Sequence, residues 1–352
     1  MFYFKSKNKI NIEYIKNITK FEEFQNKNNF FISNVNQNLR LVFNYYNFIQ
    51  ENNDYIDKFE ILNQYFERKS LFHIKQKDKD ILLNIKNIDV LPSQYSSVKQ
   101  NKKVSIVLTT YNIEGLVNIA ISSLVNQTYK NIEIILVDDG STDNTFEILQ
   151  KIRNAYPDKI QLIKLNQNYG TYIAKNMGMS YATSDLITFH DADDWAHPQR
   201  IEEHVKAHEK NKKVKFSISK LVRVTEEGYF FSKYIYPLDR LSMISLMIDR
   251  ILIDEVGYFR KQRIGSDSEY FERLKKFTKH KFVRIDKVLM FCAHRENSLT
   301  TSIETGVNGF STNNKRQHHW DKWNKWHDKL KKARRKPFVG FDRSKYKYEI
   351  IN

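Results

Sequence analysis

The stretch IEIILVDDGSTDNTFEILQKI, residues 132–152, joins a strand pattern directly to a helix pattern. Its first six residues are mainly apolar and β-branched, which predicts a strand that is buried on both faces. Two aspartates follow, and then Ser141 or Thr142 supplies a helix N-cap ahead of an amphipathic repeat. A buried strand that ends in polar residues and leads into a helix is the repeating unit of parallel α/β sheets.

The same unit recurs on both sides of this stretch. Three further apolar strand patterns are VSIVLTT (104–110), IQLIKLN (160–166) and DLITFHD (185–191), and a helix pattern lies between each strand and the next. The predicted fold class is therefore α/β, with a mainly parallel sheet between helices. Ligands bind such sheets at the carboxyl ends of the strands. Polar clusters follow all four strands, so we expect one site built from residues 109–112, 138–141, 166–170 and 191–194.

The last of these clusters concentrates negative charge. Asp191, Asp193 and Asp194 stand within four positions, directly after a buried strand. Like charges this close destabilise one another, and a buried carboxylate needs a partner. The simplest partner is a hard divalent cation, Mn²⁺ or Mg²⁺, which prefers oxygen ligands. A solvated loop before a helix near Pro198 is the alternative, but it does not explain Asp191.

The amino-acid composition excludes some classes of protein. Of 352 residues 41% are hydrophobic, which excludes a fully disordered chain, and the one cysteine excludes an intrachain disulfide. The N-terminal residues carry no apolar signal pattern, and no apolar run is long enough to span a membrane. We expect a cytoplasmic protein, either free or peripheral on the inner face of the cytoplasmic membrane.

The net charge of +17 is concentrated at the C-terminus, where residues 311–352 hold thirteen Lys/Arg and four Asp/Glu. A basic surface predicts an anionic partner. A helical wheel gathers six residues on one side of this tail: His319, Trp320, Trp323, Trp326, His327 and Leu330. The tail thus fits a helix at an anionic membrane surface, a helix packed on the domain, or a device that attracts an anionic acceptor. No nucleic-acid-binding motif is present, so no nucleic-acid partner is expected.

Three regions follow from these patterns. Residues 1–100 predict a helical N-terminal region of unknown role, since glycine is absent before Gly115 and apolar residues recur at helical spacing. Residues 101–305 hold the α/β domain. Residues 306–352 form the basic, Trp-rich helical tail.

Four blocks of the central region resemble a known family when taken together: VSIVLTTYN, SLVNQTYKNIEIILVDDGSTDNT, NYGTYIAKNMGMSYA and ITFHDADDW. They are similar to the inverting family 2 glycosyltransferases, which have the GT-A fold and include enzymes of bacterial surface-polysaccharide synthesis. The resemblance covers about Lys103 to Ala207 and continues more weakly to about Ser302. It implies a metal-dependent transfer of sugar from a nucleotide-sugar, usually UDP-linked, to a glycan or lipid-linked acceptor of capsule, lipopolysaccharide or a related polymer.

The resemblance also implies roles for individual residues. The DADD run matches the DxD motif of the family, so Asp193 and Asp191 would hold Mn²⁺ or Mg²⁺, with His294 as a further candidate ligand. The positions implied to contact the donor are Thr109, Tyr111, Asp139, Asn168, Lys175, Asp191 and Arg295. Two other functions stay open at this point: an inactive nucleotide-sugar-binding partner subunit and, with less support, a nucleic-acid-binding protein.

The implied catalytic base lies at a later helix start. In the family an acidic residue stands about six positions before an arginine, and here Asp267 precedes Arg273 by six. Ser266 occupies a position where the family often has glutamate, and Glu269 is an alternative base. Both carboxylates also fit the simple structural role of acidic residues in a first helical turn.

Overall fold

The computed structural model describes residues 58–81, 83–90, 98–232, 238–295 and 314–351, and the isolated positions 43, 47, 298, 307–308 and 311–312. The chain divides into two compact units. The smaller unit comprises Met1–Pro92, Val222–Arg240 and Cys292–Arg295, and the larger unit comprises Ser93–Leu221, Leu241–Phe291 and Glu296–Asn352.

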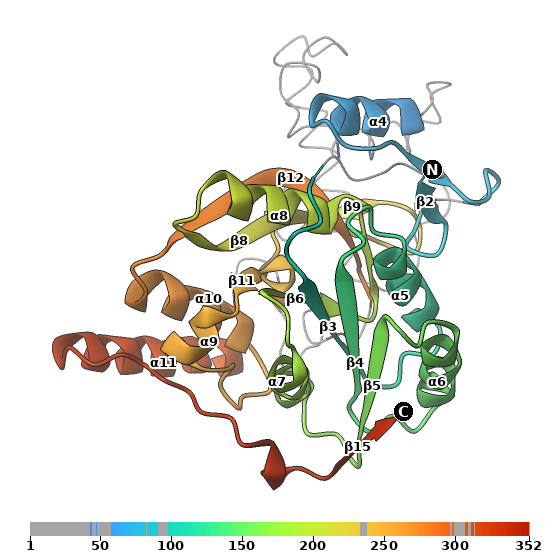
Figure 1. Ribbon diagram of the computed structural model, residues 1–352. Helices are drawn as coiled ribbons and strands as arrows, with labels where there is room; N and C mark the ends of the chain where they lie inside the picture. The colour runs from blue at the N-terminus through green and yellow to red at the C-terminus, as the bar shows by residue number, and fades with distance from the viewer. Residues whose placement is uncertain are drawn as a thin grey trace. The chain divides into compact units, whose positions relative to one another are not determined.

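The larger unit is built on four parallel strands and the three helices that connect them. In chain order these are β3 (Val104–Thr110), α5 (Val117–Val125), β4 (Ile132–Asp138), α6 (Thr145–Ala155), β5 (Ile160–Leu165), α7 (Thr171–Tyr181) and β6 (Leu186–Asp191). The strands lie side by side in the order β5-β4-β3-β6. Right-handed crossovers then put α5 and α6 on one face of the sheet and α7 on the other, as Figure 1 shows. The predicted α/β class is confirmed.

The order of the strands fixes where the strand ends meet. The chain steps from β3 to β4 and β5 on one side, and then returns to place β6 on the other side of β3. In parallel register, Thr109 lies opposite Asp191 and Thr110 lies opposite Asp138. This reversal is the position at which open α/β sheets form their ligand crevice.

Further strands extend the sheet on both sides. Beyond β6 come β11 (Met247–Asp249), β8 (Val214–Val224), β12 (Lys281–Ala293) and β7 (Asp194–Ala196). On the opposite edge, β15 (Tyr348–Ile351) pairs with β5, with Tyr348 opposite Leu165. The pairs β6–β11, β11–β8 and β5–β15 are antiparallel. The remaining helices of this unit are α8 (Arg200–Lys210), η2 (Met243–Ser245), α9 (Ile251–Val256), α10 (Ser266–Phe277), α11 (Asn314–Lys332) and η3 (Arg343–Lys345). A short hairpin, β13 (Val307–Asn308) and β14 (Ser311–Thr312), precedes α11.

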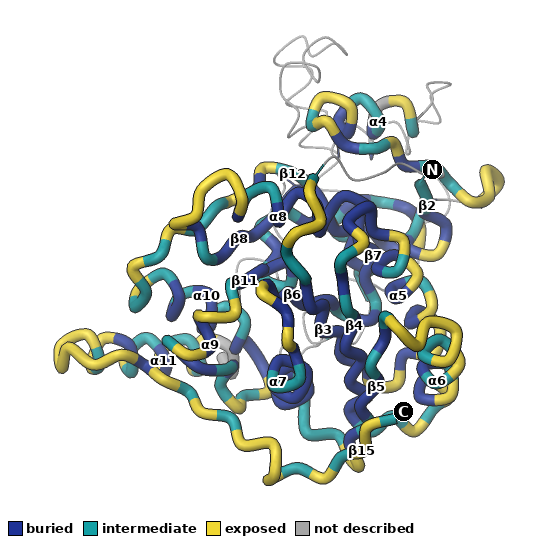
Figure 2. Tube along the Cα trace, viewed as in Figure 1, coloured by how far each residue is buried: buried dark blue, intermediate teal, exposed yellow. Residues whose placement is uncertain are grey.

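The core lies between the parallel strands and α7. All seven residues of β3 are buried, and Figure 2 shows the central strands as a continuous buried layer. Helix α7 approaches this layer closely because Gly178 has no side chain. A Cβ at Gly178 would lie 2.4 Å from Cγ1 of Val107, which is closer than packed atoms approach.

The C-terminal tail belongs to the larger unit rather than forming a region of its own. Trp323 and His327 of α11 are 6% and 1% exposed, and the His327 ring lies 5.2 Å from that of Phe277 on α10. Of the three interpretations of the tail helix, packing on the domain accounts for its Trp/His side. The lysines on its other side are exposed. Within the described residues, no helix is long and apolar enough to cross a bilayer.

The smaller unit differs in part from the predicted helical region. Helix α4 (Lys58–Arg68) agrees with the prediction, but it is followed by an antiparallel pair, β1 (Ile74–Gln76) and β2 (Ile88–Val90). Strands of three residues are too short to show a period-two pattern, so the sequence did not reveal them. Two short strands complete the described elements: β9 (Phe230–Phe231), paired with the end of β8, and β10 (Arg240–Leu241) at the boundary between the units. Most of residues 1–57 lie outside the described chain.

Candidate functional site

Three carboxylates meet where the prediction expected them. Asp191, Asp193 and Asp194 each offer a carboxylate oxygen within 4.8 Å of the others. Asp191 ends β6 and Asp194 begins β7, so two strands of the sheet fix the turn between them. Asp194 is buried, whereas Asp191 and Asp193 are partly exposed. An all-oxygen set of this kind fits the preference of Mg²⁺ and Mn²⁺ for hard ligands.

Lys175 supplies a positive charge next to this aspartate cluster. Its Nζ donates a hydrogen bond of 2.8 Å to Oδ1 of Asp191, and its side chain is only 5% exposed. Burial lowers the pKa of Lys175, but the opposing attraction of Asp191, with smaller contributions from Asp267 and Asp194, raises the pKa above its ordinary value. The ammonium group is therefore charged and offsets part of the negative charge of the cluster.

His190 and Arg200 form a buried, hydrogen-bonded pair beside the aspartate cluster. The Nδ1 atom of His190 accepts a bond of 3.0 Å from Arg200, so Nε2 carries the proton that is donated to the carbonyl of Asp194 at 3.1 Å. Arg200 also donates to the carbonyl of Phe189 at 2.6 Å. Burial, with the charge of Arg200 adding to it, lowers the pKa of His190 to about 3. His190 is thus neutral and has a structural role.

The DDGS turn after β4 uses both aspartates to shape the backbone. Asp138 accepts from the Thr110 hydroxyl at 3.0 Å and from the Ser141 amide at 3.1 Å. The two oxygens of Asp139 accept the amides of Tyr169 and Gly170, each at 2.8 Å. Burial raises the pKa of Asp139 to about 6, against the effect of these two hydrogen bonds. Asp139 therefore fixes the 166–170 loop, and its implied contact with the donor stays a prediction.

Gly140 allows the turn and the 166–170 loop to touch. Its φ is +75°, and a Cβ at this position would lie 2.5 Å from the carbonyl carbon of Gln167. We expect Gly140→Ala to lower the free energy of unfolding by about 2 kcal/mol or more, because left-handed strain and a backbone clash add. The change should also weaken donor binding, since the loop carries Asn168.

Gly115→Ala is the matched control, because no atom lies within 4 Å of its added Cβ and its φ is not positive. Urea denaturation of both variants measures the difference. The assignment of Gly140 is contradicted if the two substitutions cost the same free energy, within about 0.5 kcal/mol.

The other residues implied to contact the donor lie on the same strand ends. The hydroxyls of Thr109, at the end of β3, and Thr171, at the start of α7, are 3.2 Å apart. Tyr111 follows β3 and is 47% exposed, and Asn168 is half-buried in the 166–170 loop. Thr109 is paired with Asp191 across the sheet, and the contacts of these residues with the donor stay predictions.

Asp267 is connected to the aspartate cluster through α7. It lies half-buried in the first turn of α10, and its Oδ1 accepts a hydrogen bond of 3.0 Å from the phenol of Tyr172. Burial, together with the charge of Asp267, raises the pKa of Tyr172 well above its ordinary value, so the phenol keeps its proton and donates it. Sequence reasoning missed Tyr172. The available signal was its spacing, three residues before Lys175 on one helical face.

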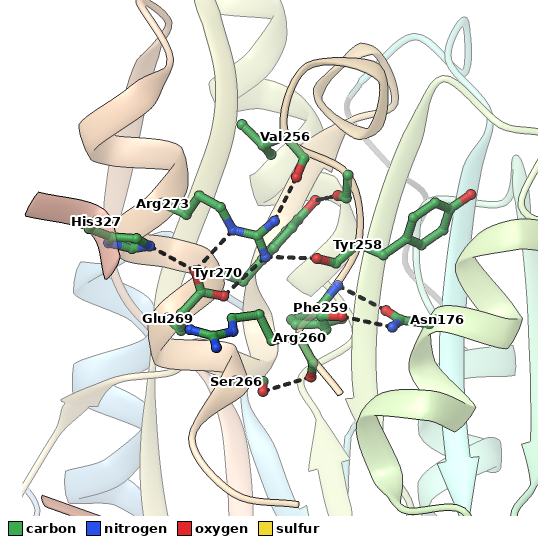
Figure 3. A network of polar contacts seen from close by, with 11 residues as sticks. Asn176, Val256, Tyr258, Phe259, Arg260, Ser266, Glu269, Tyr270, Arg273 and His327 are labelled. Atoms are coloured by element: carbon green, nitrogen blue, oxygen red, sulfur yellow. Dashed lines mark hydrogen bonds and ion pairs between the residues drawn. The ribbon is translucent and has the colours of Figure 1, made fainter. Parts of the chain in front are cut away.

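Glu269, the alternative base, is placed differently. Its side chain is fully buried and accepts two bonds of 3.0 Å from Arg273 and one of 2.8 Å from His327 (Figure 3). An acceptor hydroxyl has no surface on which to approach this carboxylate. Ser266, which stands where the family often has glutamate, donates through Oγ to the carbonyl of Arg260 at 2.9 Å. These two residues hold the backbone around Asp267.

His294 and Arg295 belong to the smaller unit. The His294 ring lies 4.2 Å from the ring of Phe231, and burial lowers its pKa to about 4. Neither ring nitrogen of His294 has a hydrogen-bond partner among the described residues. Arg295 is half-buried. Their implied roles at the metal and at the donor stay predictions.

Comparisons with known proteins find sequences similar to the central part of this chain. Residues 105–271 match the family model described as "Glycosyl transferase family 2". An uncharacterized glycosyltransferase of Haemophilus influenzae is 30% identical over 172 residues, which are 49% of this chain and 65% of the relative. The Escherichia coli protein named UDP-Glc:alpha-D-GlcNAc-diphosphoundecaprenol beta-1,3-glucosyltransferase WfaP is 40% identical over 92 residues, 26% of this chain and 36% of the relative.

Among solved structures, S. aureus TarS 1-349 in complex with UDP-GlcNAc matches with a TM-score of 0.46 and 19% identity, over 56% of this chain and 60% of that chain. The chain thus spans less than two thirds of the length of each of these relatives.

Proposed function

We propose that the protein is an inverting, metal-dependent glycosyltransferase, because residues 105–271 match the model of glycosyl transferase family 2, as the sequence motifs predicted. Its donor is a nucleotide-sugar, in the first instance a UDP-sugar, and its acceptor is a glycan or a lipid-linked glycan of a bacterial surface polysaccharide such as capsule or lipopolysaccharide. The observation that carries the proposal is the aspartate cluster beside the charged Lys175, at the reversal of strand order. The name of the Escherichia coli relative supports both a UDP-sugar and a diphospholipid-linked acceptor.

In this proposal Asp191 and Asp193 would hold the divalent cation, and Asp194 shapes the turn. When bound, the cation supplies Lewis-acid stabilisation of the negative charge on the leaving nucleoside diphosphate. Lys175 keeps Asp191 oriented and adds positive charge beside it. Thr109, Tyr111 and Asn168 line the strand ends for the nucleotide and the sugar.

Asp267 is the proposed base. The acceptor hydroxyl oxygen attacks the anomeric carbon while its proton passes to Asp267. The bond between the anomeric carbon and the diphosphate oxygen breaks, and its electron pair leaves with the diphosphate. The hydrogen bond from Tyr172 supports the assignment, because it holds one carboxylate oxygen of Asp267 and leaves the other to accept the proton.

The test is a panel of UDP-, GDP-, CMP- and dTDP-sugars with Mn²⁺, scored for nucleotide release and for thermal stabilisation. We expect one UDP-sugar to give both effects and EDTA to remove both. Stabilisation without turnover for any acceptor supplied would favour the alternative of an inactive nucleotide-sugar-binding subunit. The absence of any response, with or without metal, would refute the proposal.

We further propose that the tail brings the enzyme to the anionic inner face of the cytoplasmic membrane. The surface of the tail that would face the membrane consists of exposed residues: Lys322, Lys325, Lys329, Lys331, Lys332, Arg334, Arg335, Lys336 and, at 58% exposure, Phe338. Each lysine or arginine near an anionic bilayer contributes about 1 kcal/mol. Sedimentation with phosphatidylglycerol vesicles, but not with phosphatidylcholine vesicles, is the expected result. Equal recovery with both, or preference for duplex DNA over anionic vesicles, would contradict it.

A further inference from the structure

Five hydrogen bonds from three side chains hold the backbone that leads into α10 (Figure 3). Arg273 donates to the carbonyls of Val256 at 2.6 Å and Tyr258 at 2.7 Å. Asn176 of α7 bonds both the amide and the carbonyl of Phe259 at 2.9 Å, and Ser266 bonds the carbonyl of Arg260. This held segment, residues 256–266, ends at the residue before Asp267. Its conformation therefore sets where Asp267 lies.

Glu269 orients Arg273, which makes two of these hydrogen bonds. It bonds Arg273 through two of the guanidinium nitrogens, and this pairing directs the remaining donors of Arg273 at the two backbone carbonyls. Both side chains are fully buried, so water cannot replace a missing partner. A buried carboxylate needs every hydrogen bond that it can obtain.

The third hydrogen bond to Glu269 comes from outside the family 2 match. His327 lies on α11, well beyond residue 271, and its Nε2 is 2.8 Å from Oε1 of Glu269. Its Nδ1 has no hydrogen-bond partner among the described residues, which fits the tautomer with the proton on Nε2. The rings of Phe277, Trp323 and Trp326 surround the imidazole, each at 5.2 Å, and fix its orientation.

We propose that His327 is a positioning residue for the transfer reaction, which acts through Glu269 and Arg273 to hold residues 256–266 and thereby Asp267. In this proposal the C-terminal helix α11 contributes to catalysis by holding the segment that positions Asp267. This inference rests on the proposed function, because it takes Asp267 as the base. It also accounts for the Trp/His side of α11 without a membrane role for that side.

The test compares two substitutions of His327 that differ in hydrogen bonding. His327→Leu fills most of the volume but cannot donate, whereas His327→Gln keeps an N–H donor. We expect His327→Leu to lower the kcat of UDP release from UDP-glucose or UDP-N-acetylglucosamine with Mn²⁺ at least tenfold, with the donor KM within twofold of wild type. His327→Gln should recover most of the kcat. His318→Ala, an exposed position on the same helix, should change neither value.

Amide hydrogen exchange gives a second readout that does not depend on turnover. Residues 256–270 should exchange faster in His327→Leu than in wild type or His327→Gln, while β3 and β4 stay protected. If His327→Leu does not fold, His327→Asn replaces it, because its amide is too short to reach Glu269. The proposal is overturned if the non-donating variant matches wild type in kcat, or if exchange in 256–270 is unchanged. If wild type turns over no donor, the proposed function fails, and the exchange experiment still decides whether His327 holds the segment.

Discussion

Asp193→Ala is expected to lower kcat for sugar transfer by about 1,000-fold or more, while the protein stays folded. The reason is the proposed role of Asp193 in holding the cation. A bound cation contributes several kcal/mol of charge stabilisation to the leaving group, and each 1.36 kcal/mol is a factor of ten in rate. Asp193 is partly exposed, and it lies within 4.8 Å of two other carboxylates. Removing one of three like charges should not lower the stability of the metal-free protein.

Two binding measurements and a control variant check this prediction alongside kcat. Titration with Mn²⁺, followed by electron paramagnetic resonance, should show a loss of metal affinity in Asp193→Ala. Thermal stabilisation by the UDP-sugar and Mn²⁺ should also be lost, as it is for wild type in EDTA. Asp158→Ala, which removes an exposed carboxylate in the loop before β5, is the control and should behave as wild type. Wild-type activity in Asp193→Ala, or wild-type activity in EDTA, would remove the metal from the mechanism.

The sequence predicted the centre of this site because its signals are local. Each of the strands β3, β4, β5 and β6 is a short apolar run followed by polar residues, and strand–helix alternation forces their ends to one edge of the sheet. The pairing of Thr109 with Asp191 also requires β6 to lie next to β3, which strand–helix alternation does not fix. The cluster of three aspartates could be predicted because these carboxylates directly follow a buried strand in the sequence.

The parts that the sequence did not predict depend on contacts between distant segments. Glu269 and Asp267 are both acidic residues in the first turn of α10, and contacts with Arg273 and with His327 of α11 accompany the full burial of Glu269. The four residues of β15 join the sheet through the exposed edge of β5, so no periodicity within them reveals a partner. From the sequence, Tyr172 cannot be told from an aromatic residue of the core, and only the structure shows that its hydroxyl donates to Asp267.

Asp267→Asn is the second large effect that we expect. General base catalysis contributes about 100- to 10,000-fold to rate, and kcat should fall by that amount because the amide cannot take the acceptor proton. Asparagine keeps the size of the side chain and an oxygen that can accept from Tyr172 and from the Ser268 amide, so the fold and donor binding should be retained. The donor-dependent rise in melting temperature should therefore match that of wild type.

Two companion variants decide which carboxylate is the base. Glu272→Gln, on the same helix and paired only with Lys275 among the described contacts, is the neutral control and should keep its activity. Glu269→Gln should mainly lower the free energy of unfolding, because it disturbs a buried pair with Arg273 and His327. If Asp267→Asn keeps its rate while Glu269→Gln loses rate without losing stability, the assignment of the base passes to Glu269. Loss of rate and of donor binding together in Asp267→Asn would instead make Asp267 a donor ligand, because a base that acts only on the acceptor leaves the donor complex intact.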